Sequence, residues 1–203
     1  MSITGVELST YTFAGDLEGI STYSLPNTLL VAIENTYEII EYNYVTGNTV
    51  PHTMNYTNSG SANSGIKGVT HDSNTGNIYF LNEKNPGALI IADSNFVVTN
   101  EYVLTYAGDY SASYFVEETG FLWLGSDMES IVYKCNTNGS VIETFPITQD
   151  GTLGGDPLGK LEGIAIDYAN NFLYIVSDAG QFLYVYKIIE NPLPLELIEF
   201  DVS

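Results

Sequence analysis

Acidic side chains recur at a constant spacing, and they are the first sign of chemistry in this sequence. A small residue serves as the anchor of each copy: Gly19, Gly68, Ala112 and Gly163. Fifteen residues after each anchor stands an acid: Glu34, Glu83, Asp127 and Asp178. Immediately before each anchor stands a polar residue: Glu18, Lys67, Ser111 and Glu162. Carboxylate oxygens in this number are the ligands that Ca²⁺ prefers, and like charges held close together raise carboxyl pKa values.

The elements that position these residues read as short β-strands. Each anchor lies in one strand, and the acid follows a second, strongly apolar strand such as 28–33 or 172–176. A third strand follows the acid, and a fourth is visible in at least three copies. The anchors are 49, 44 and 51 residues apart, whereas the anchor-to-acid offset never changes. Four antiparallel strands in about 40–50 residues are typical of one propeller blade.

The sequence therefore predicts an all-β fold, a β-propeller with four visible four-stranded blades. The blades start near residues 16, 65, 109 and 160, inside a domain spanning 1–190. Residues 5–13 are expected to form an outer closing strand, and residues 191–203 a C-terminal strand or linker. A variant of a five-bladed plan is a further reading of the same pattern.

The first strand of a blade lines the central channel and the second runs back beside it, so the polar residues should meet at one mouth. We predict a ligand-binding ring there, formed by Glu18, Glu34, Lys67, Glu83, Ser111, Asp127, Glu162 and Asp178. The predicted metal ligands, for Ca²⁺, are Glu18, Glu34, Glu162 and Asp178. The alternative is purely structural, since acids at strand ends often accept backbone N–H bonds in turns. His71, at the end of a first strand, is interpreted as structural.

Composition excludes several classes of protein. Acids outnumber bases by 25 to 5, with no arginine, which gives a net charge of -20. Such a field disfavours partnership with nucleic acid or an anionic membrane surface, and no apolar run reaches the roughly 20 residues of a membrane helix. The single cysteine excludes an internal disulfide framework. With 44% hydrophobic residues, the chain is too apolar to be disordered.

The repeat resembles a known family, the SdiA-regulated domain, a propeller related to phytase-like and NHL-type propellers. The resemblance covers about residues 14–187 and rests on Asp-Leu-Glu-Gly at 16–19, Glu-Lys-Asn-Pro at 83–86, Asp-Tyr-Ser at 109–111 and Leu-Glu-Gly-Ile at 161–164. Lys67 stands where the second motif of that family usually carries glutamate, and an earlier repeat expected before Asp16 is missing. Residues 191–200 resemble the segment that precedes the sorting module of Bacteroidetes secreted proteins, which implies an extracellular or cell-surface protein.

The leading functional hypothesis is an extracellular, non-enzymatic binding or structural module. In it, terminal strands pair with a neighbouring copy to give a chain or fibre. Enzyme signatures are weak, because the sequence has no Gly-x-Ser-x-Gly elbow. One alternative is a calcium-dependent, phytase-like phosphoesterase. A second is a carbohydrate-binding module that uses exposed tyrosines, so a glycan or small polar ligand is a candidate partner.

Overall fold

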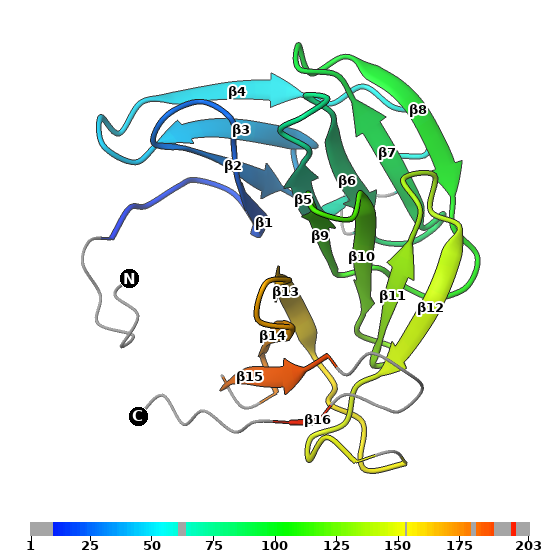
Figure 1. Cartoon of the computed structure of the whole chain (residues 1–203). Helices are drawn as coiled ribbons and strands as arrows, with labels where there is room; N and C mark the ends of the chain where they lie inside the picture. Colours follow the sequence, from blue (N-terminus) through cyan, green and yellow to red (C-terminus); the bar gives the residue numbers. More distant parts are fainter. Residues whose placement is uncertain (1–9, 61–63, 153, 180–181, 189–195, 198–203) are drawn as a thin grey trace.

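The computed structural model describes residues 10–60, 64–152, 154–179, 182–188 and 196–197. Within them, sixteen strands form four separate four-stranded sheets, each built from consecutive strands (Figure 1). No helix long and apolar enough to span a membrane occurs in these residues. The predicted four-bladed β-propeller is confirmed.

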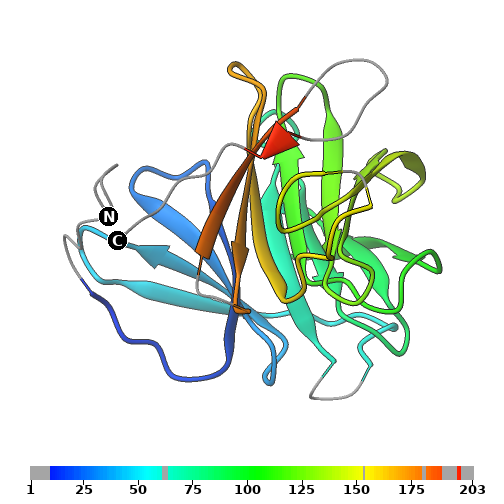
Figure 2. The ribbon, with the colours of Figure 1, turned by 90° about the horizontal axis from the view of Figure 1, so that it is seen from below.

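All neighbouring strands within a sheet are antiparallel. Blade 1 comprises β1 (Leu17–Thr22), β2 (Thr28–Ile33), β3 (Glu38–Asn43) and β4 (Thr49–Thr53). Blade 2 comprises β5 (Ile66–His71), β6 (Ile78–Asn82), β7 (Ala88–Ala92) and β8 (Val98–Val103). Blade 3 comprises β9 (Ala112–Val116), β10 (Phe121–Ser126), β11 (Ile131–Cys135) and β12 (Val141–Pro146). Blade 4 comprises β13 (Leu161–Asp167), β14 (Phe172–Ser177), β15 (Phe182–Lys187) and β16 (Glu196–Leu197), with β16 running beside β15 (Figure 2).

The closing strand predicted for residues 5–13 is described only in part. Residues 1–9 and most of 189–203 lie outside the described residues. Residues 10–13 carry no strand, but Phe13 packs edge-on against Tyr42 of β3 at 4.8 Å between ring centroids, and the Tyr11 hydroxyl donates to the Tyr44 carbonyl. This stretch therefore packs against the third strand of blade 1. The segment before β9 makes a similar contact in blade 3, where the ring of Tyr106 packs against Tyr133 of β11.

Blade-to-blade burial forms the core. We call the side of a blade that faces the following blade its trailing face, and the side that faces the preceding blade its leading face. Three apolar clusters join blade 1 to 2, blade 2 to 3 and blade 3 to 4. Residue pairs in contact also link β1 to β5, β5 to β9 and β9 to β13. The fold is held by these three interfaces, since hydrophobic burial is its main favourable term.

Glycine at the anchor position brings neighbouring inner strands into direct backbone contact. A Cβ atom on Gly19 would lie 2.5 Å from the Lys67 carbonyl oxygen, and one on Gly68 would lie 2.7 Å from the backbone nitrogen of Ser113. Both distances are too short for a real Cβ atom, so only glycine fits. In blade 4, a Cβ on Gly163 would meet only the side chain of Val176, in its own blade.

The two outer faces of the four-bladed arc have less cover than the inner faces. On blade 1, Phe13 packs against the buried Val31, Ile33 and Tyr42, but other residues of the two outer faces are exposed. Leu17 in β1 is 45% exposed, while its counterparts in the other blades, Ile66, Tyr110 and Leu161, are fully buried. At the other end of the arc, Val176 is 47% exposed and its cross-strand partner Leu183 is 36% exposed. The pairs that occupy this place in blades 1 and 2, Ala32 with Ile39 and Leu81 with Leu89, are 0% exposed. The arc is therefore open between blades 4 and 1 (Figure 1).

This asymmetry predicts unequal costs for two chemically identical substitutions. Gly68→Ala should lower the free energy of unfolding by about 1–3 kcal/mol, because a methyl group is forced against backbone atoms. Gly163→Ala should cost clearly less, since the exposed Val176 side chain can rotate away. Urea denaturation of both variants measures the difference. Equal losses would contradict the open arc.

Candidate functional site

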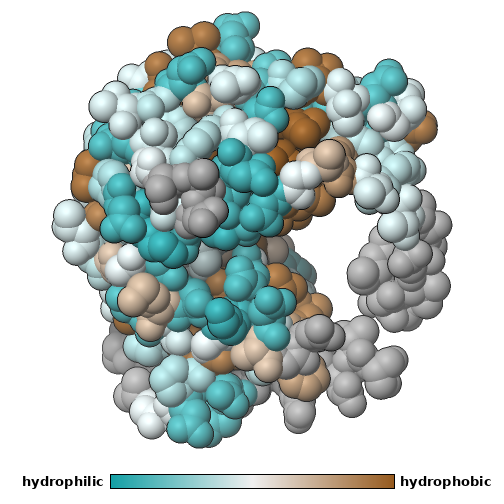
Figure 3. All heavy atoms as spheres, turned by 180° about the vertical axis from the view of Figure 1, so that it is seen from behind, coloured by the Kyte–Doolittle hydropathy of each residue, from teal (hydrophilic) through white to brown (hydrophobic). Residues whose placement is uncertain are grey.

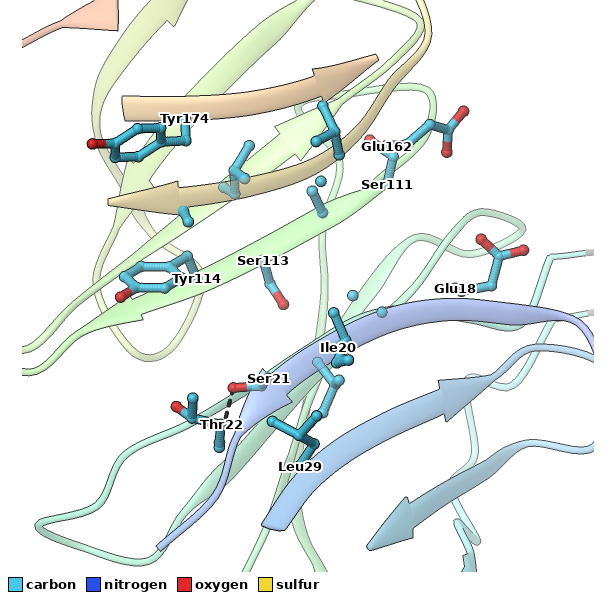
Figure 4. Close-up of a pocket in the computed structure, with 18 of the residues that line it drawn as sticks. Glu18, Ile20, Ser21, Thr22, Leu29, Ser111, Ser113, Tyr114, Glu162 and Tyr174 are labelled. Atoms are coloured by element: carbon cyan, nitrogen blue, oxygen red, sulfur yellow. Dashed lines mark hydrogen bonds between the residues drawn. The ribbon is translucent and has the colours of Figure 1, made fainter. Parts of the chain in front are cut away.

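The polar residues before the anchors lie at irregular points of the inner strands. The pairing of β1 with β2, of β5 with β6 and of β13 with β14 shifts register at Glu18, Lys67 and Glu162 respectively. Such bulges re-aim side chains. Glu18 and Glu162 point toward the same end of the space between blades 1 and 4 (Figure 4). We call this end the acidic mouth.

Lys67 forms ion pairs with two carboxylates at the acidic mouth. Its Nζ lies 2.7 Å from Glu18 Oε1 and 3.5 Å from Glu34 Oε2. Glu34 is 5% exposed and also accepts a hydrogen bond from the Gly65 N–H. Burial by itself would lower the pKa of Lys67, but the Glu18 hydrogen bond and the charges of Glu18 and Glu34 together raise it. One ammonium group thus joins two carboxylates from blade 1 to the inner strand of blade 2.

The other residues of the predicted ring form no ion pair with Lys67 among the described residues. Burial raises the pKa of Glu162, and the charges of Asp127, Asp178 and Glu18 raise it further, while Lys67 opposes them. These acids therefore act on one another across blades 1, 3 and 4. Glu83 instead forms an ion pair with the adjacent Lys84. The Ser111 hydroxyl is 3.4 Å from the Gly125 carbonyl oxygen and is buried at the cavity wall.

A carboxylate cluster differs from the predicted metal set. Asp16, Glu18 and Glu34 each place an oxygen within 4.8 Å of the others. Asp16 was not among the predicted ligands, although it belongs to the Asp-Leu-Glu-Gly motif of the first blade. Lys67 Nζ contacts two of the three, Glu18 and Glu34, so a cation of the protein's own already offsets part of their charge. This arrangement favours an ion pair over a cation site.

An open cavity of about 580 Å³ adjoins the acidic mouth. Its wall includes Ile20 and Leu29 of blade 1, Val176 and Leu183 of blade 4, and the inner strands between them. Figure 3 shows the hollow from behind, with hydrophobic residues along its wall. The uncovered faces of the arc thus line one continuous space with charged groups at one end.

Ser113, on the floor of this cavity, was missed by the sequence analysis. Its side chain is labelled between Tyr114 and Ile20 in Figure 4. The residue is 9% exposed, and its Oγ has no hydrogen-bond partner among the described residues. A buried hydroxyl without a partner carries a desolvation penalty that a bound group can remove. The only sequence signal is its place directly after an anchor, where other blades carry Ile20, Val69 and Ile164.

The raised pKa of Glu162 predicts a pH-dependent effect on stability. Its folded pKa exceeds the ordinary value of 4.5, so the ionised group opposes folding at neutral pH, and this opposition vanishes as the pH falls to 4.5 and below. Glu162→Gln should raise Tm at pH 7 by roughly 1 °C, a small effect because the side chain is only partly buried and water still reaches it. At pH 4 it should change nothing. Thermal melts with Glu118→Gln as control test this, and a Glu162→Gln protein no more stable than the control at pH 7 would contradict it.

The position of Lys67 predicts that calcium and the ammonium group compete for the same carboxylates. The natural protein should melt at the same temperature with Ca²⁺ or with a chelator. Lys67→Gln leaves Asp16, Glu18 and Glu34 without a countercharge, so Ca²⁺ should raise its Tm by a few degrees. A calcium-dependent rise in the natural protein would instead support the metal set predicted from the sequence.

Comparison with known proteins agrees with this architecture. Among curated proteins no relative matches the chain. A crystal structure of a nidogen/laminin complex superposes with a TM-score of 0.61 at 12% identity, covering 85% of this chain and 59% of that one. The chain therefore spans less than two thirds of that structure's length, and the likeness concerns the fold alone. The SdiA-regulated family model matches residues 2–187, nearly the whole sequence, and the chain belongs to the SdiA-regulated family.

Proposed function

We propose that this domain is a non-enzymatic binding module whose open cavity receives a β-strand segment of a partner protein. The observation that carries the proposal is the exposure of Val176 and Leu183 at positions that are fully buried in blades 1 and 2. Contiguous apolar residues exposed around a hollow are typical of interaction sites.

The three closed interfaces indicate what kind of partner fits. At each of them, the inner strand of the next blade covers the trailing face and inserts apolar residues, such as Ile66 and Val69 from β5. Gly163 keeps the backbone of β13 open to close approach, as Gly19 does for β5. A strand with apolar residues three positions apart therefore has the complementary shape, and strand recognition of this kind is common in protein complexes.

Polar groups give such a partner its orientation. The Ser113 hydroxyl lacks a partner inside the cavity, and Glu18 and Glu162 lie at one end of it. A net charge of -20 favours a segment with basic residues near that end, because complementary charge speeds association and excludes acidic competitors. The partner we propose is thus apolar in the middle and neutral or basic at the end beside the acidic mouth.

An extracellular location and fibre formation through terminal strands stay predictions of the sequence. The segment 191–203 on which they rest lies largely outside the described residues. Its described part, β16, pairs with β15 of the same chain. Strand addition in the open cavity does not require either prediction, since it uses blade faces and not chain ends.

A peptide of the chain's own inner strand, residues 65–72, is a suitable probe. It should bind the natural protein with millimolar or better affinity, and Val176→Asp should abolish binding by placing a charge on the apolar wall. Val103→Asp in β8, at a residue that is also half exposed, is the matched control and should bind normally. Chemical-shift titration measures all three.

A second peptide tests whether recognition depends on the apolar spacing. The same peptide carrying Ile66→Asp should not bind. The proposal fails if the natural protein does not respond to the unmodified peptide, or if Val176→Asp and Val103→Asp bind it equally well.

A further inference from the structure

A second, smaller pocket lies at the end of the inner strands that is opposite to the acidic mouth. It has a volume of about 240 Å³ and is formed where β1, β5 and β9 end. Ser21, Thr22 and Tyr114 mark this end in Figure 4, away from Glu18 and Glu162. Ser21, Thr22 and Tyr114 border both spaces. We call the second space the hydroxyl pocket.

His71 is the unusual residue of the hydroxyl pocket. It is 8% exposed, and its Nε2 is buried without a hydrogen-bond partner among the described residues. The ring of Tyr23 meets the imidazole edge-on, at 4.8 Å between centroids. The other histidine differs, because His52 Nε2 lies 2.7 Å from Glu41 and its ring stacks on Phe96. A buried polar atom that lacks a partner is rare in folded proteins and calls for an explanation.

The rest of the wall is rich in neutral hydroxyl groups. They belong to Ser21, Thr22, Tyr23, Ser24, Thr70, Ser73 and Tyr114. The one acid of the wall, Glu117, accepts hydrogen bonds from the Ser73 backbone N–H and the Asn74 side chain. Its oxygens are therefore already engaged on the rim. Burial lowers the pKa of His71, against the charges of Glu117 and Asp72, which favours the neutral imidazole.

These features select the chemistry of a ligand. A neutral imidazole nitrogen and hydroxyl side chains both match alcohol groups, which donate and accept hydrogen bonds equally well. An anion would face Glu117 and a net charge of -20. Among the described residues, the carboxylate cluster of Asp16, Glu18 and Glu34 lies at the other end. The volume equals that of about eight water molecules at roughly 30 Å³ each, which is room for one sugar ring.

We propose that the hydroxyl pocket binds a small neutral polyol, a single sugar ring or cyclitol, with His71 Nε2 hydrogen-bonded to one ligand hydroxyl. Tyr23 and Phe115 supply apolar surface for the C–H face of the ring. The inference does not rest on strand binding in the open cavity, because Tyr23, His71 and Phe115 line the hydroxyl pocket and not the open cavity.

The two histidines make the test specific, since they are the only imidazoles in the chain. Nitrogen-15 NMR of the imidazoles, titrated with glucose, galactose, N-acetylglucosamine and myo-inositol, should shift the Nε2 signal of His71 with at least one probe. The His52 signals should stay in place. Unchanged His71 signals with all four probes, which would mean that only water fills the pocket, overturn the proposal, as does an equal shift at both histidines.

Variants give a second measurement. His71→Phe keeps the ring volume and removes the nitrogen, so it should weaken binding of the responding probe at least tenfold, while His52→Phe should leave it unchanged. Should His71→Phe fail to fold in thermal melts, the titration of the natural protein decides alone. Val176→Asp should bind the polyol normally, which separates failure of this proposal from failure of strand binding.

Discussion

Every element of this domain depends on the burial of one blade face against the next. A single four-stranded sheet of this size has two apolar faces and cannot cover either of them by itself. Glycine at Gly19 and Gly68 lets adjacent inner strands touch through their backbones, and the side chains beyond them then interlock. Four blades make three such interfaces, so two faces are left at the ends of the arc. The open cavity is a direct consequence of this count and needs no special residues to create it.

The same constraint places charge where it can be neutralised. Bulges at Glu18 and Lys67 bring oppositely charged side chains of neighbouring blades together, at the point where their backbones are closest. The resemblance described above implies glutamate at position 67. A glutamate there would have been a third carboxylate facing Glu18 and Glu34. In a chain with five basic residues and 25 acidic ones, that single lysine converts a repulsive contact between blades into an attractive one.

The repeat could be predicted because strand and turn chemistry are local. The constant offset between Gly19 and Glu34, and between Gly163 and Asp178, reflects a hairpin of fixed geometry, so sequence alone predicted a propeller of four four-stranded blades. The openness of the arc could not be predicted, because Leu17 and Leu161 are the same residue type at the same place in their repeats. They differ only in whether a preceding blade covers them. The ion pairs of Lys67 could not be predicted from the sequence either, since they depend on the spacing between blades.

Each inner strand also separates two kinds of chemistry along its length. β5 starts beside the ion pair of Lys67 and ends at the buried, neutral His71, and β1 runs likewise from Glu18 to Thr22. Because a strand advances about 3.3 Å per residue, five residues hold the two ends roughly 13–17 Å apart. A ligand at the hydroxyl pocket is therefore too far from the acids at the mouth to contact them. Coupling between the two ends would have to pass through side chains that border both spaces, and Ser21, Thr22 and Tyr114 are the residues in that position.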